Sequence, residues 1–66
     1  MRRKFTTVWT AGREAKGLSV EDAANRAKVN KVTVYRALAN NGATLQVATL
    51  EALCRAVGVR PQDCWV

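Results

Sequence analysis

The feature that most constrains the fold of this chain is a run of 26 residues, 17–42, which reads GLSVEDAANRAKVNKVTVYRALANNG. Apolar residues recur within it at helical spacing in two short blocks, and helix-breaking residues separate the blocks. The run therefore predicts two helices, Val20–Ala27 and Lys31–Ala39, joined by a tight turn.

The ends of both helices carry signals of their own. Ser19, followed three residues later by Asp22, resembles a capping box, because its hydroxyl can accept a free backbone N–H at the helix start. Val29 is the apolar residue of the turn, and Asn30 is a favourable N-cap for the second helix. Residues 40–42 are Asn-Asn-Gly, which tolerates a left-handed backbone and is expected to end that helix.

The spacing also separates an inner from an outer face on each helix. Small inner side chains let another helix cross closely, and on the first helix they are Ala23, Ala24 and Ala27. On the second helix an apolar stripe is formed by Val34, Ala37 and Leu38. The opposite face must point away from the core, and it carries Lys31, Val32, Tyr35, Arg36 and Ala39.

Segments on both sides of this run show helical spacing as well. A helix is expected over residues 6–16, with Thr6 or Thr7 as its cap and an inner face of Phe5, Val8, Trp9 and Gly12. Another is expected over residues 46–57, with an inner face of Val47, Leu50, Leu53, Cys54 and Val57. Residues 60–63 are expected to begin a last helical turn, since Pro61 suits the first helical position.

No segment alternates with a period of two well enough to predict a strand. The sequence therefore predicts an all-α fold, a compact bundle of five short helices that forms one domain over residues 1–66. A chain of this length is near the lower limit for a domain without metals or disulfides. It leaves no room for a sensing module, so no small-molecule ligand is expected.

In this combination the chain resembles the lambda-repressor-like helix-turn-helix family of phage repressors, Cro proteins and small bacterial regulators. The resemblance covers about residues 5–65 and rests on Gly-Leu-Ser before the first helix of the pair, Ala24, Val29, Val34 and a later amphipathic helix that ends in Gly58-Val59. It implies a lambda-repressor-like bundle in which helix Lys31–Ala39 enters the major groove of double-stranded DNA.

Among the positions that depart from the family pattern, three bear on phosphate contact, on the turn and on an ion pair. Val20 stands where many members have a glutamine that touches a phosphate, so only its backbone N–H can serve. Lys28 replaces the usual glycine of the turn, and we expect it to adopt a left-handed or strained conformation. Leu38 stands where some members have an acidic partner for the arginine that matches Arg13, which puts that ion pair in doubt.

Outward residues of the second helix are the candidates for reading bases, because Lys and Arg can donate to guanine acceptors and Val can contact a thymine methyl. These are Lys31, Val32, Tyr35 and Arg36. Candidates for phosphate contact are Ser19, Val20, Lys28, Thr33, Asn40 and Asn41. For the phosphate set, capping and turn formation are alternative roles. A basic arm of Arg2, Arg3 and Lys4 either follows DNA or is a solubilising end.

Strong positive charge favours a polyanion partner, although charge alone fits a membrane surface or a ribosomal protein equally well. The net charge is +6 and no histidine is present. No apolar run approaches the roughly 20 residues that span a bilayer, and no hydrophobic signal segment follows the basic start, so a cytoplasmic protein without membrane contact is expected. Cys54 and Cys64 should then be reduced thiols, and their ten-residue spacing without histidine makes no zinc site. No cofactor is expected.

The C-terminal segment carries more apolar groups than one helical turn can hide, which indicates a homodimer interface. Its candidates are Val59, Cys64, Trp65 and Val66. For Trp65, a place over its own core is equally consistent with the sequence.

The leading hypothesis is a sequence-specific transcriptional regulator of the phage Cro or repressor type, a homodimer on a partly palindromic operator. The runner-up is an antitoxin that binds its own promoter and a toxin protein. A non-specific RNA- or nucleoid-binding protein is a third hypothesis. No constellation of residues indicates catalysis, because without histidine most of the remaining general bases fall at helix starts or on exposed faces.

Overall fold

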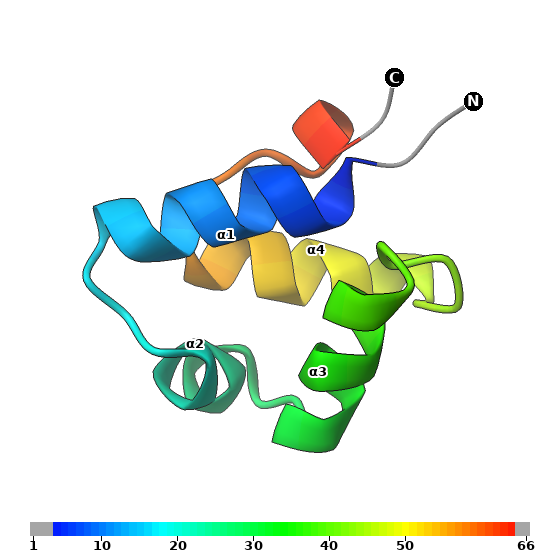
Figure 1. Cartoon of the computed structure of the whole chain (residues 1–66), viewed down its shortest axis with the longest axis horizontal. Coiled ribbons are helices and arrows are strands. Elements are labelled where there is room, and N and C mark those ends of the chain that lie inside the picture. Colours follow the sequence, from blue (N-terminus) through cyan, green and yellow to red (C-terminus); the bar gives the residue numbers. More distant parts are fainter. Residues whose placement is uncertain (1–3, 65–66) are drawn as a thin grey trace.

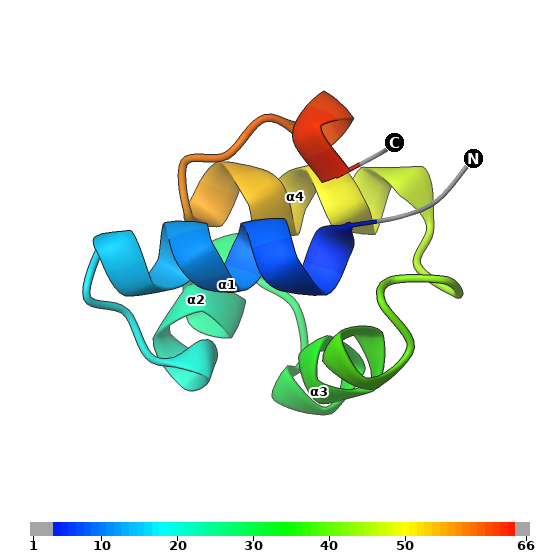
Figure 2. The ribbon, with the colours of Figure 1, turned by 45° about the horizontal axis from the view of Figure 1, so that its top comes forward.

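The computed structural model describes residues 4–64. Its elements are α1 (Phe5–Ala15), α2 (Val20–Ala27), α3 (Lys31–Ala39), α4 (Val47–Ala56) and a short 3-10 helix, η1 (Pro61–Cys64). Helices α1 and α4 lie side by side, with η1 on one side of them and α2 and α3 on the other (Figure 1). Figure 2 shows the same arrangement after a 45° turn.

Local capping determines where α2 and α3 begin. The Ser19 hydroxyl accepts the Asp22 N–H at 3.0 Å, and the Asp22 carboxylate accepts the Ser19 N–H at 3.4 Å, which completes the predicted capping box. Oδ1 of Asn30 accepts the Val32 N–H at 2.8 Å and caps α3. Both helices have the predicted bounds.

The turn between them contains a non-glycine residue with a left-handed backbone. Lys28 has φ 58° and ψ 40°, as the sequence predicted, and its N–H donates to carbonyls of the last turn of α2. A side chain in this region is uncommon and costs some conformational energy. Val29 follows it, half-buried against the core, and so joins the turn to the core.

The core is one cluster to which α1, α2, α3, α4 and η1 all contribute. Phe5 and Trp9 are its largest aromatic members and are stacked with ring centroids 5.9 Å apart. Trp9 Nε1 also donates to the Leu53 carbonyl of α4 at 2.9 Å, so its polar atom is satisfied. Each fully buried large side chain stabilises the fold by about 1.5–3 kcal/mol.

Arg13 has no carboxylate partner among the described residues, in agreement with the doubt raised by Leu38. Its Nη1 donates instead to the Leu18 carbonyl at 2.6 Å, and its guanidinium lies 6.0 Å from the centroid of the Trp9 ring. The arginine therefore joins the end of α1 to the connection that leads into α2.

Two features of the sequence prediction need correction. The described chain has four α-helices rather than five, because the predicted last turn is the 3-10 helix η1. Val47, predicted on the inner face, is 62 % exposed, because it is the first residue of α4 and lies beyond the buried stretch that starts at Leu50. The all-α class is confirmed for residues 4–64, where no strand occurs.

The start of α1 also differs from the prediction. The helix begins at Phe5, with Lys4 as a cap residue whose side chain makes no capping bond. Thr6 is inside the helix, and its N–H donates to Oδ1 of Asn41 at 2.8 Å. The acceptor for this helix end therefore comes from the connection after α3, a source that local sequence patterns do not indicate.

Candidate nucleic-acid interface

The outer face of α3 carries exposed apolar and cationic side chains next to one another. Val32 and Tyr35 are 50 % and 52 % exposed and lie three residues apart, so they share a face of the helix. Lys31 and Arg36 are exposed beside them. Among the described residues only Val47 joins these two as an exposed large hydrophobic side chain. Burial of Val34 and Ala37 fixes the outer face in this direction.

Such a face has the chemistry that a DNA groove requires. The major groove admits an α-helix, and guanine presents two acceptors there for Lys or Arg donors. The thymine methyl group is a partner for an aliphatic side chain such as that of Val32. The structure thus brings together the four residues that the sequence analysis selected for base contact: Lys31, Val32, Tyr35 and Arg36.

An ion pair joins this face to α2. Lys31 Nζ lies 3.3 Å from Oε1 of Glu21, and the two side chains are 60 % and 59 % exposed. Glu21 is in the first turn of α2, where an acidic residue also favours the helix dipole. Sequence spacing does not indicate this pairing, because the two residues are ten positions apart in different helices.

Residues predicted to contact phosphate are divided among several local roles. Ser19 is exposed at the start of α2 and accepts the capping bond, while Val20 is half-buried at the first helical position. Thr33 is exposed on α3. The first N–H groups of α2 have no partner within the helix unless a cap supplies one, so this end remains compatible with an anion.

The two asparagines after α3 both use side-chain atoms within the fold. Asn40 Oδ1 accepts the Ala43 N–H at 3.2 Å, and its Nδ2 donates to the Thr44 hydroxyl at 3.1 Å. Asn41 accepts the Thr6 N–H, as described above, and has φ 58°. For both residues the structure shows the turn-forming and capping roles that the sequence analysis kept as alternatives.

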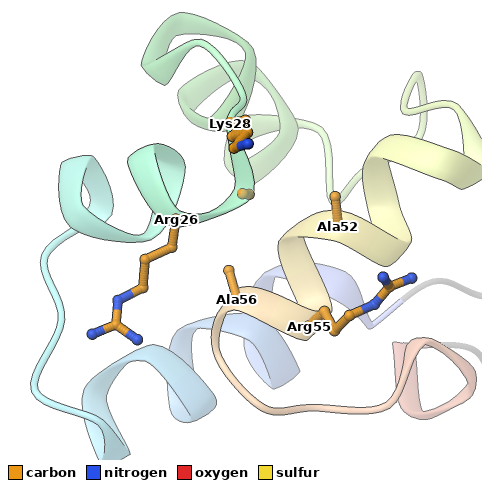
Figure 3. A pocket seen from close by; sticks show the side chains of 6 residues that line it. Arg26, Lys28, Ala52, Arg55 and Ala56 are labelled. Carbon is orange, nitrogen blue, oxygen red and sulfur yellow. The ribbon is translucent and has the colours of Figure 1, made fainter.

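Lys28 lies at a hollow between α2 and α4 (Figure 3). The hollow has a volume of about 310 Å³ and is lined by Arg26, Ala27, Lys28, Ala52, Arg55 and Ala56. Arg26 and Arg55 were not selected from the sequence, although each lies in the last turn of a helix, where a cation favours the dipole. Arg26 is two positions before Lys28 at the end of α2, whereas Arg55 joins the lining of the hollow because α2 packs on α4.

The predicted arm and dimer interface fall largely at the ends of the described chain. Arg2, Arg3, Trp65 and Val66 lie outside the described residues. The N–H of Lys4 donates to the Cys64 carbonyl at 2.6 Å, which joins the two ends of the described chain. Cys64 is only 1 % exposed and belongs to the core, which corrects its assignment to an interface. Val59 is half-buried against that core.

The two thiols are buried and adjacent. Sγ of Cys54 lies 3.5 Å from Sγ of Cys64, and both cysteines are free. Burial, with the hydrogen bond to Cys64 adding to it, raises the pKa of Cys54 to about 12. Burial likewise raises the pKa of Cys64. Both groups are therefore neutral at pH 7. Among residues 4–64 no group of three or more His, Cys, Asp or Glu could hold a metal ion.

Comparison with known protein families matches residues 11–63 to the helix-turn-helix domain. The match covers most of the chain, and the protein belongs to this family. Membership is consistent with the lambda-repressor-like resemblance and indicates a DNA-binding regulator. Neither a curated protein nor a solved structure shows significant similarity to the chain. Within the described part of the chain, no helix has the length and apolar character needed to span a membrane.

Proposed function

We propose that this protein is a sequence-specific transcriptional regulator that binds double-stranded DNA with α3 in the major groove. Lys31 and Arg36 donate to guanine acceptors, Val32 contacts a thymine methyl group, and Tyr35 contacts a base edge or phosphate. The proposal includes no catalytic step.

The observation that carries the proposal is the exposure of Val32 and Tyr35 between two cations on one helix face. Adjacent exposed apolar side chains rimmed by polar residues are typical of a surface that binds a partner. The neighbouring cations, Lys31 and Arg36, favour a polyanion as that partner, and the net charge of +6 favours it as well.

We also propose that two copies bind together on a partly palindromic site. One recognition helix reads only a few base pairs, and a second copy one helical turn away multiplies both affinity and specificity. Sedimentation of the protein with and without a selected duplex measures the stoichiometry. Two copies on one duplex are expected, and a one-to-one complex on the full site would exclude this arrangement.

Selection of duplexes from a random library by the wild-type protein tests the DNA preference. Affinities are then measured for the selected duplex and for a scrambled duplex of the same composition. Lys31→Ala and Tyr35→Ala are expected to weaken binding to the selected duplex by about 1–3 kcal/mol each and to change binding to the scrambled duplex much less.

Arg55→Ala is the matched control, because it removes one exposed positive charge from α4 rather than from the outer face of α3. It should weaken binding to both duplexes equally. Two results would contradict the proposed function and indicate non-specific binding. In one, the wild type selects no sequence. In the other, bulk DNA competes for the protein as effectively as unlabelled selected duplex does.

A further inference from the structure

We infer that Glu21 is a specificity-determining residue that acts by fixing the ammonium group of Lys31. The inference rests on the proposed function, and it concerns a residue that makes no base contact of its own in this scheme. Glu21 lies on α2, while the outer face that reads DNA belongs to α3. Both helices lie on the same side of α1 and α4 (Figure 2).

The geometry singles out this carboxylate. Among residues 4–64 three ion pairs occur, and the other two join residues no more than four positions apart. Only the Glu21–Lys31 pair joins two helices, and it holds the first residue of α3. Because both side chains are mostly exposed, the pair contributes little to folding. The main effect of the pair is therefore on the position of the Lys31 side chain at the outer face of α3.

The donors of Lys31 are limited by this pair. An ammonium group has three N–H donors and no acceptor. One donor directed to Glu21 leaves two, which match the O6 and N7 acceptors that guanine presents in the major groove. A long, flexible side chain loses rotamer freedom when it binds, and prior attachment to Glu21 reduces that loss.

Glu21 also opposes contact with an arbitrary phosphate. If Lys31 turned to the DNA backbone, the Glu21 carboxylate would be left beside phosphates without its cation, and like charges repel. Asp22 differs in this respect, because its carboxylate is used in the capping box. Glu21 thus makes the wrong contact unfavourable, which is a general means of raising specificity.

Glu21→Ala tests the inference with the selected and scrambled duplexes, measured over a range of salt concentrations. Binding to the scrambled duplex should strengthen, and its salt dependence should steepen by about one unit of slope, because Lys31 becomes free to contact phosphate. The preference for the selected duplex should fall by about tenfold. The melting temperature should fall only slightly, because the lost interaction of the exposed Glu21 carboxylate with the dipole of α2 is weak.

Glu51→Ala is the charge-matched control, since the Glu51 carboxylate pairs at 4.0 Å with Arg55 within α4. It should strengthen both complexes without changing their ratio. A second control is Glu21→Ala in a Lys31→Ala background, where the mutation should no longer alter the ratio.

Either of two results would overturn the inference. In one, Glu21→Ala leaves the preference as it is in the wild type or changes it only as much as Glu51→Ala does. In the other, the effect of Glu21→Ala persists without Lys31, so that the carboxylate acts independently of it. In both cases the wild type still prefers its selected duplex and the proposed function stands. A wild type without any preference would remove the proposed function together with the inference.

Discussion

The N–H of Thr6 donates to Oδ1 of Asn41 at 2.8 Å, across 35 positions of the chain. The Thr6 hydroxyl also donates to the Leu38 carbonyl at 2.9 Å. These two bonds attach the first turn of α1 to the last turn of α3 and the connection after it. They secure the C-terminal end of the helix whose outer face we assign to DNA.

Removal of the Asn41 side chain should therefore destabilise the fold. Asn41 has φ 58°, so Asn41→Gly removes the acceptor and keeps a residue that adopts this backbone easily. We expect a loss of about 1 kcal/mol in the free energy of unfolding. Denaturant titration measures it. Asn41→Asp retains Oδ1 and is expected to stay close to the wild type, and equal stability of all three proteins would show that the bond contributes nothing.

Gly12 lies where α1 packs closely against the end of α4 and the chain that follows it. A Cβ at this position would lie 2.5 Å from Cγ1 of Val59 and 3.2 Å from the Val57 carbonyl oxygen. Gly12→Ala should therefore cost about 1–3 kcal/mol through overpacking, even though alanine favours helices. A thermal melt checks this, with Ala11→Ser at the exposed neighbouring position as the control. Combining Gly12→Ala with Val59→Ala should restore part of the lost stability, because it removes Cγ1 of Val59. If the double variant were no more stable than Gly12→Ala, the contact with Val59 would not be the cause of the loss.

Ala24 is 1 % exposed where α2 meets the core. A leucine there would need space that the packed interior lacks, so Ala24→Leu should lower stability by about 1–3 kcal/mol. Asn25→Leu, next to it but exposed, is the control for added apolar surface. The comparison is made by differential scanning calorimetry. Similar melting temperatures for the two variants would contradict the assigned inner face of α2.

Local signals were sufficient to predict α2 and α3, because the Ser19 and Asn30 caps act on N–H groups only two or three residues away. Tertiary partners were not predictable in this way. Helical spacing put Val47 on the inner face but does not reveal which turns of a helix are covered. The attachment of Thr6 to Asn41 and of Lys31 to Glu21 depends on how helices pack, which a single sequence does not specify.

Alkaline pH should destabilise the protein through the buried thiol. Since the pKa of Cys54 is raised to about 12 in the fold, the unfolded chain loses its proton first, from about pH 9 upwards. The contribution of the neutral Cys54 thiol to the free energy of unfolding is therefore full below the pKa of this thiol in the unfolded chain. It is lost as the pH rises towards 12. The slope should be on the order of 1 kcal/mol per pH unit. The free energies of unfolding of the wild type and of Cys54→Val should diverge between pH 8 and 11. If both fell in parallel with pH, the raised pKa of Cys54 would be contradicted.

The bond from the Lys4 N–H to the Cys64 carbonyl has a topological consequence. It brings residues 60 positions apart into contact beside η1, on the opposite side of α1 and α4 from α2 and α3 (Figure 1). A short peptide could bridge the two positions into a circular permutant, reopened at the exposed Gly17. A fluorescent label or fused domain carried at either position would then point away from the helix that we assign to DNA.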